Sequence, residues 1–197
     1  VGTAVVSIYN TEDAIIASCS VKVETAPTMI GFSNGMKNLT LNMMIETYQL
    51  SVEMTPADPY AGLVWETSDS KIATVDQRGL VTLHSPGTVL ITVFPAHNPN
   101  NIHASVAIEV LQQTEGLSLD TTSATLAVGE KIKLTYTMTP ATASNKNVTW
   151  SSMDSKIATV DADGTVVAKA IGQTYIVAVS ENGSHMANCS VTVTQMA

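Results

Sequence analysis

Charged side chains are scarce in this sequence. Asp, Glu, Lys and Arg make up 13% of its 197 residues, whereas about 25% is usual for soluble proteins. Basic residues are fewest, with 9 Lys and Arg against 17 Asp and Glu, and they form no cluster. Without a basic patch to neutralise phosphates, a chain of net charge −8 is expected to bind no nucleic acid and no anionic membrane surface.

Long hydrophobic runs and aromatic residues are also missing. No stretch of 18 apolar residues occurs, so we expect no membrane insertion in this segment. Aromatic residues make up 5% of the chain, which argues against a dedicated carbohydrate-binding face built from stacked rings. Hydrophobic residues nevertheless reach 45%, a content that excludes an intrinsically disordered chain.

An internal repeat organises the sequence. The segment Asp69–Asp76 (DSKIATVD) recurs unchanged as Asp154–Asp161, and Cys19–Val23 (CSVKV) resembles Cys189–Val193 (CSVTV). Identity of this length at a fixed period is typical of tandem arrays. The sequence therefore predicts the C-terminal strands of a truncated repeat at 1–26, followed by complete repeats at 27–112 and 113–197.

Each repeat has the two-residue period of β-strands. Ile132, Leu134, Tyr136 and Met138 alternate with polar residues, which places one face of a strand in a core and the other in water. Gly and Pro separate such runs at short intervals, and no segment forms a convincing amphipathic helix. The pattern predicts an all-β chain of tandem immunoglobulin-like, Greek-key β-sandwiches with about seven strands each.

Several motifs of the last repeat resemble a known family. They are LSL at 117–119, AVGEK at 127–131, LTYTMTP at 134–140, VTWSS at 148–152 and IATVD at 157–161. In this order they resemble the group 2 bacterial Ig-like domain (BIG2). The resemblance implies an extracellular or cell-surface multidomain protein or, alternatively, a virion surface protein. It implies no catalytic residues, and we expect neither an enzyme nor a cofactor.

The two cysteines occupy equivalent places in different repeats. Val106 takes this place in the middle repeat, and a position that accepts valine is typical of a core. We therefore expect Cys19, Val106 and Cys189 to be buried core residues. Intermolecular pairing of the thiols is the alternative.

Each complete repeat carries one tryptophan at the same place, Trp65 and Trp150. We expect both to pack in the cores, with sugar stacking as the alternative. Asp161 and Asp163 resemble the start of a calcium loop, but the equivalent turn has Arg78 in place of the second carboxylate. A structural turn is the simpler interpretation, and no metal site is expected.

The leading functional hypothesis is a stiff spacer, in which linkers poor in Gly and Ser join successive sandwiches. Neighbouring Ig-like domains of the same chain would then be its partners. The second hypothesis is an adhesin that contacts a protein or glycan at a surface. Its candidate residues lie in the long loop of the middle repeat: His97, Asn98, Asn100 and Asn101. The third is an accessory module of a secreted hydrolase, or a virion protein.

Overall fold

The computed structural model describes residues 2–23, 25–57, 62–97 and 100–195. The N-terminal segment contains β1 (Gly2–Tyr9) and β2 (Ile15–Val23). The middle repeat contains β3 (Met29–Phe32), the short 3-10 helix η1 (Ser33–Gly35), β4 (Asn38–Asn42), β5 (Thr47–Gln49), β6 (Val52–Thr55), β7 (Leu63–Thr67), β8 (Ala73–Val75), β9 (Leu80–Leu83), β10 (Gly87–Pro95) and β11 (Ala104–Leu111). The last repeat contains β12 (Gly116–Leu119), β13 (Ser123–Ala127), β14 (Lys131–Lys133), β15 (Tyr136–Thr139), β16 (Val148–Ser152), β17 (Ala158–Val160), β18 (Thr165–Ala168), β19 (Gly172–Ser180) and β20 (Met186–Thr194).

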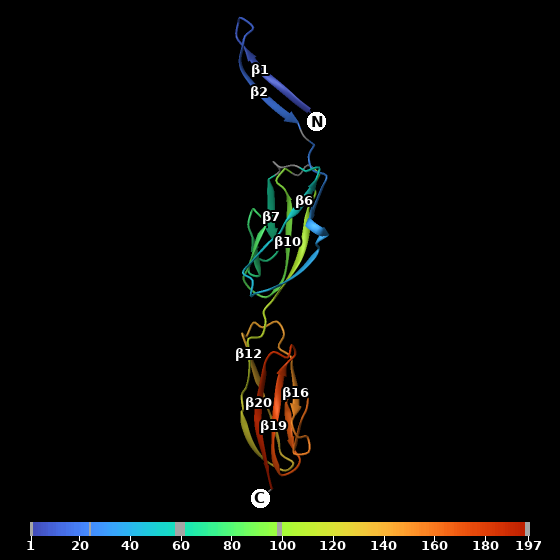
Figure 1. Ribbon diagram of the computed structural model, residues 1–197, viewed down its shortest axis with the longest axis vertical. Coiled ribbons are helices and arrows are strands. Elements are labelled where there is room, and N and C mark those ends of the chain that lie inside the picture. The colour runs from blue at the N-terminus through green and yellow to red at the C-terminus, as the bar shows by residue number, and fades with distance from the viewer. Residues whose placement is uncertain (1, 24, 58–61, 98–99, 196–197) are drawn as a thin grey trace. The chain divides into compact units, whose positions relative to one another are not determined.

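The two complete repeats share one sheet arrangement. In the last repeat a four-stranded sheet has the order β13-β20-β19-β16, a three-stranded sheet has the order β14-β18-β17, and β12 pairs with β15 (Figure 1). The middle repeat has the corresponding sheets β4-β11-β10-β7, β5-β9-β8 and β3-β6. The prediction of tandem immunoglobulin-like β-sandwiches is confirmed.

Some strands predicted as continuous are divided in the structure. The alternating run from Ile132 to Met138 forms β14, which pairs with β18, and β15, which pairs with β12. The middle repeat divides its equivalent run in the same way, into β5 paired with β9 and β6 paired with β3. Because each half pairs with a different sheet, the described part of each repeat has more strands than the expected seven or so.

Burial alternates along the long strands of the complete repeats as the sequence predicts. It does not alternate along β1 and β2, which are exposed on both faces, and Tyr136 is exposed although the run from Ile132 to Met138 places it on the core side. β10 and β19 have the same nine-residue pattern of buried and exposed positions, and Ile91 and Ile176 are both fully buried. The core of the last repeat contains Leu119, Leu126, Leu134, Ala158, Val166, Ala168, Ile176, Ala178, Cys189, Val191 and Val193.

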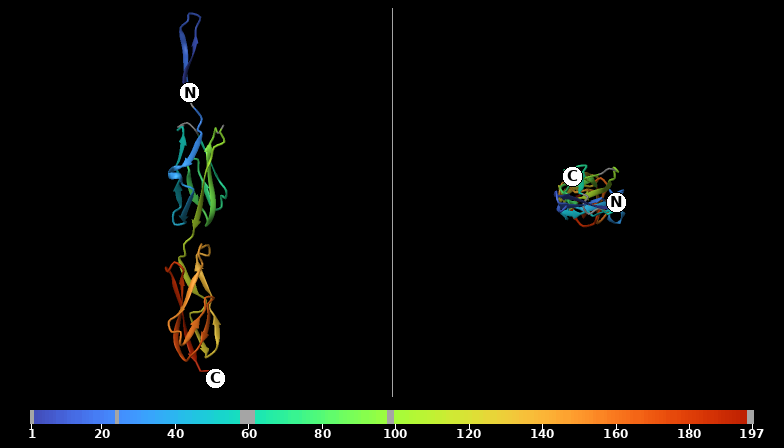
Figure 2. Two further views of the ribbon diagram at one scale, coloured as in Figure 1. Left: turned by 90° about the vertical axis from the view of Figure 1, so that its right-hand side faces the viewer. Right: turned by 90° about the horizontal axis from the view of Figure 1, so that it is seen from above.

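Tertiary contacts divide the chain into two compact units. Residues 1–39, 46–83 and 88–109 form the first unit, and residues 40–45, 84–87 and 110–197 form the second. The β1–β2 hairpin (blue in Figures 1 and 2) is a separate two-stranded antiparallel sheet. The repeat boundaries near residues 26 and 112 stay predictions from the sequence.

Candidate functional site

The loop between β19 and β20 contacts the linker that enters the last repeat. Nε2 of the half-buried His185 lies 2.9 Å from the main-chain oxygen of Thr114. A carbonyl oxygen only accepts hydrogen bonds, so Nε2 carries the proton that is shared in this contact. Thr114 lies two residues before β12, and the bond therefore ties the loop to the start of the repeat.

The middle repeat makes the same kind of contact with a different side chain. Nδ2 of Asn100, in the loop between β10 and β11, donates to the main-chain oxygen of Pro27 at 2.8 Å. Pro27 lies two residues before β3, as Thr114 lies two residues before β12, and β3 and β12 begin opposite the equivalent residues Thr55 and Thr139. We call these two hydrogen bonds the loop–linker contacts.

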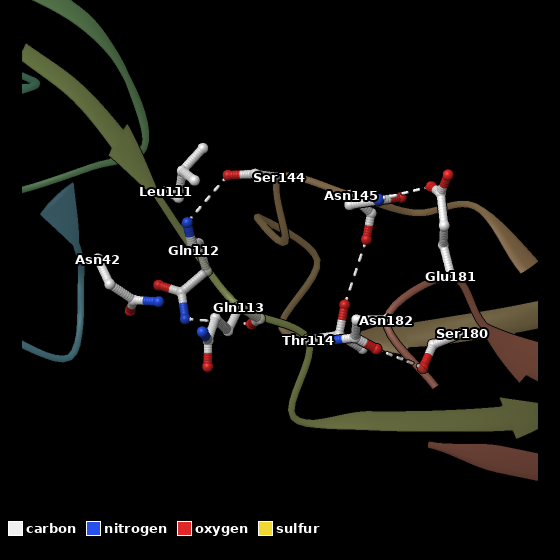
Figure 3. A pocket seen from close by; sticks show the side chains of 10 residues that line it. All are labelled: Asn42, Leu111, Gln112, Gln113, Thr114, Ser144, Asn145, Ser180, Glu181 and Asn182. Atoms are coloured by element: carbon white, nitrogen blue, oxygen red, sulfur yellow. Dashed lines mark hydrogen bonds between the residues drawn. The ribbon is translucent and has the colours of Figure 1, made fainter. Parts of the chain in front are cut away.

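Further polar contacts fix the linker of the last repeat. Gln112 and Ser144 exchange two hydrogen bonds of 2.9 Å, from the Gln112 main-chain nitrogen to Ser144 Oγ and from the Ser144 nitrogen to the Gln112 oxygen (Figure 3). The hydroxyl of Thr114 donates to the main-chain oxygen of Asn145 at 3.2 Å. Linker residues 112–114 are therefore bonded to two separate loops of the last repeat.

A carboxylate holds one of these loops in place. Glu181 Oε2 accepts a hydrogen bond from Nδ2 of Asn145 at 2.6 Å (Figure 3) and another from Nδ2 of Asn147 at 3.0 Å. Both bonds lower the pKa of Glu181, and the bond from Asn145 has the larger effect. The cause is that an amide donor stabilises the ionised carboxylate. The loop after β19 thereby holds the loop before β16, which in turn binds the linker.

The candidate ligand loop of the middle repeat is only partly described. Asn98 lies outside the described residues, His97 is exposed, and Asn101 has a φ of +50°. Asn100 belongs to the loop–linker contact. Sequence reasoning singled out this loop for its length and missed its bond to Pro27, because the two residues are far apart in the sequence.

The three equivalent core positions have different surroundings. Val106 and Cys189 are fully buried, whereas Cys19 is exposed, and neither thiol is in a disulfide. The expectation that Cys19 is buried is wrong for this structure, because no described strand covers the face of β2 that carries it. Burial raises the pKa of the Cys189 thiol, and the negative charge of Asp120 adds to the effect.

The tryptophans are half-buried at equivalent places. The Trp150 ring meets Tyr136 edge to face at 6.2 Å between centroids, and Trp65 lies 6.1 Å from Phe32. Trp150 packs against the core of the last repeat. Buried Nε1 of Trp65 has no hydrogen-bond partner among the described residues.

The turn that resembled a calcium loop is closed by protein contacts. The main-chain nitrogen of Gly164 donates to the Asp161 oxygen at 3.0 Å, and the Asp163 carboxylate forms an ion pair with Lys133. Within the described ranges, no group of three or more His, Cys, Asp or Glu side chains is placed to hold a metal ion. No helix in these ranges is long and apolar enough to cross a membrane.

Two segments of the chain match one known family. The family model for the bacterial Ig-like domain (group 2) matches residues 44–100 and 113–191. An Ig-like virion protein of Serratia phage KSP90 is 30% identical over 193 residues, which cover 95% of this chain and 69% of that protein. An uncharacterized protein of Clostridium acetobutylicum is 29% identical over 171 residues, which cover 86% of this chain but only 17% of that protein.

Partial matches extend to longer enzymes. An alpha-L-arabinofuranosidase of Bifidobacterium longum is 47% identical over 72 residues, which cover 36% of this chain and 7% of the enzyme. Among solved structures, the four N-terminal Ig domains of Dscam1 isoform 7.44 match with a TM-score of 0.53 at 12% identity, covering 90% of this chain and 51% of that one. That likeness concerns the fold alone. Because the family model covers well over half of the residues, this chain belongs to the bacterial Ig-like domain (group 2) family.

Proposed function

We propose that this chain is a non-catalytic structural module that holds neighbouring domains apart on the surface of a particle or cell. The observation that carries the proposal is the recurrence of the loop–linker contact in both complete repeats, His185 to Thr114 and Asn100 to Pro27. A side chain that binds a linker carbonyl removes rotational freedom from the linker. A spacer needs this property, since a freely hinged linker does not maintain a distance.

The way the linker is bonded supports restricted bending. Its main-chain groups at Gln112 and Thr114 bind loop residues of the last repeat, and the main-chain nitrogen of Glu115 donates to the Thr139 oxygen at 2.7 Å. Several consecutive residues are therefore ordered by one repeat. The residue directly before them, Leu111, is already the last residue of β11.

Among possible locations, we favour a virion surface over a bacterial cell surface. The similarity to the Ig-like virion protein covers 95% of this chain and more than two thirds of that protein, so the shared part forms most of the relative. Antibodies against this chain should label intact virions from the source in immunogold electron microscopy. Labelling of bacterial cells without virions would instead place the module on the cell surface.

The stiffness of the linker is measurable by the distance between two spin labels. Glu66→Cys and Ser151→Cys place labels on exposed positions of the two complete repeats, in a background carrying Cys19→Ser and Cys189→Val. We expect a narrow distribution of distances by double electron–electron resonance, which His185→Ala broadens. With His185→Asn in place of His185→Ala, we expect the distribution of distances to stay narrow, because the middle repeat uses Asn for the same contact.

A matched control is available in the other loop–linker contact. Asn100→Ala removes the bond to Pro27. Pro27 does not lie between the two labelled residues, so this substitution should leave the distribution of distances unchanged. The melting temperatures of the variants show whether each repeat stays folded. An equally narrow distribution with and without the His185 side chain would contradict the proposed role of the contact.

A second candidate function is an accessory module of a secreted glycosidase. The match to the alpha-L-arabinofuranosidase, 47% over 72 residues, favours it. Since those residues are 7% of the enzyme, the similarity concerns a small part of it. Recovery of the chain from culture medium as part of a longer glycosidase, with no labelling of virions, would favour this function.

A further inference from the structure

The middle repeat has a shallow pocket beside strand β10, which Figure 1 labels together with its neighbour β7. The pocket has a volume of about 300 Å³, at the lower limit for small-molecule sites. It is lined by Thr92, Phe94, Pro95, Ala96, Asn101 and His103. All of these residues belong to the first compact unit, so the pocket is formed within one repeat.

Phe94 supplies an aromatic ring to this pocket. In β10 the side chains of Ile91 and Val93 are fully buried in the core, so Phe94 points to the opposite face of the sheet. It is half-buried there, which leaves part of the ring accessible. The last repeat has Val179 at the equivalent place, since Val179 faces Thr149 as Phe94 faces Val64. The fold therefore does not require an aromatic residue at this position.

Polar side chains surround the ring. Thr92 lies two residues before Phe94 on the same face, and its hydroxyl is 2.9 Å from that of Ser105. Thr92 also faces Glu66 across β10 and β7, which places this carboxylate on the same side of the sheet. Asn101 and His103, both exposed, line the pocket from the segment that leads into β11. An amide, an imidazole and a hydroxyl offer donors as well as acceptors of hydrogen bonds.

This combination of groups fits a neutral sugar better than other ligands. A pyranose has a face of C–H groups, which packs on the electron-rich face of an aromatic ring, and a rim of hydroxyls that donate and accept. A quaternary ammonium ligand needs a cage of several rings, whereas this pocket has one. An anion is disfavoured by Glu66 and by the net charge of −8. An apolar side chain would remove water from the amide and the imidazole without replacing its hydrogen bonds.

We propose that this pocket binds a single neutral sugar unit, with the pyranose ring stacked on Phe94 and its hydroxyls bound by Asn101 and His103. One aromatic ring suffices for one sugar unit, so the low aromatic content of the chain, which argues against an extended face of stacked rings, does not conflict with it. The long loop that the sequence singled out contributes Asn101 alone among its candidate residues. The site is separate from the spacer function, which rests on the loop–linker contacts.

Titration of the isotope-labelled full chain, followed by nuclear magnetic resonance, tests the proposal. The probes are the neutral methyl glycosides of glucose, galactose, mannose and N-acetylglucosamine. We expect at least one of them to shift the main-chain amide signals around the pocket. The uronic acid that corresponds to this sugar should bind more weakly, because its carboxylate meets Glu66. Equally tight binding of the acid would overturn the assignment to a neutral ligand.

Phe94→Val tests the stacking of the sugar on the ring. It introduces the residue of the equivalent position, Val179, and should weaken binding by about 10-fold or more, since the packing surface for the sugar is lost. Leu90→Val is the matched control, because Leu90 is an exposed apolar residue on the same face of β10 and does not line the pocket. It should leave the affinity unchanged.

Two further variants test the polar contacts. Asn101→Gly removes the amide but permits the φ of +50° at this residue, and His103→Met introduces the residue found at the equivalent Met186. Each should weaken binding by about 10-fold, as the loss of one hydrogen bond does, while the melting temperature stays the same. The proposal is wrong if none of the neutral glycosides shifts the signals around the pocket. It is also wrong if folded Phe94→Val or Asn101→Gly binds the sugar as tightly as the original chain.

Discussion

The indole of Trp150 lies directly against Gly164, so closely that a methyl group at Gly164 would come within 2.9 Å of Trp150 Cζ2. The same added atom would come within 2.7 Å of the main-chain oxygen of Leu134. The middle repeat repeats this packing between Trp65 and Gly79, where the corresponding distance to Cζ2 is 2.7 Å. The half-buried tryptophans therefore depend on glycine at one turn of each repeat.

Gly164→Ala is expected to destabilise the last repeat strongly. The residue has a φ of +85°, so a side chain adds backbone strain of about 1–2 kcal/mol. The clash with Trp150 and Leu134 adds about 1–3 kcal/mol to the loss in free energy of unfolding. Urea denaturation followed by circular dichroism measures the total.

Gly129→Ala is the matched control for this substitution. Gly129 has a φ of +91°, and a methyl group there meets nothing within 4 Å. It should show the backbone strain without the clash. Equal losses for the two variants would mean that the contact between Trp150 and Gly164 contributes nothing.

Trp150→Ala should lower the free energy of unfolding of the last repeat by about 3 kcal/mol, at the lower end of core aromatic truncations because the ring is half-buried. Its contacts with Tyr136 and with the core disappear. Urea denaturation again gives the measurement, with Trp65→Ala as the companion variant for the middle repeat. A loss below about 0.5 kcal/mol, typical of surface positions, would show that the indole is not a packing residue.

Sequence reasoning predicted the features that depend on local pattern. The identical segments at 69–76 and 154–161 give β8 and β17 with the same burial, and the two-residue alternation from Ile132 to Met138 correctly predicts that Leu134 and Met138 are buried. Both kinds of information lie within a few residues of the strand concerned.

Features that depend on distant parts of the chain were not predicted. Cys19 has the sequence surroundings of Cys189 but not its covering strands, so its exposure is invisible in the local pattern. The loop–linker contacts use His185 in one repeat and Asn100 in the other, in loops of different length. The sequence does show that the two loops follow equivalent strands, β10 and β19. This equivalence identifies neither the side chain that donates nor the carbonyl that accepts.

The ion pair between Asp163 and Lys133 predicts a pH dependence of stability. The hydrogen bond from Lys133 is the main cause that lowers the pKa of Asp163 from 3.8 to about 2, and the hydroxyl and main-chain nitrogen of Thr165 contribute as well. Between pH 3.8 and about pH 2, the folded state therefore binds fewer protons than the unfolded state. The stability that this carboxylate contributes is present above pH 3.8 and is lost as the pH falls toward 2.

Asp163→Asn should flatten the fall in stability over this acidic range, as measured by urea denaturation at a series of pH values. Lys133→Gln, which introduces the residue found at the equivalent Gln49, should flatten it partly. The effects of the two substitutions should not add when combined, because each removes the same interaction. Additive effects, or a wild-type curve that is insensitive to salt, would contradict a role for this exposed pair.

Two substitutions at Cys189 should differ sharply in their effects. Cys189→Val introduces the residue of the equivalent buried position, Val106, and should change the free energy of unfolding by less than about 1.5 kcal/mol, as volume-conserving apolar substitutions do. Cys189→Ser is nearly the same size but places a hydroxyl in a fully buried position. It should cost about 1–3 kcal/mol, because the hydroxyl loses water without gaining a strong partner. Cys19→Val and Cys19→Ser at the exposed Cys19 should change the free energy of unfolding little. A large difference between these two variants would mean that β2 is covered in solution.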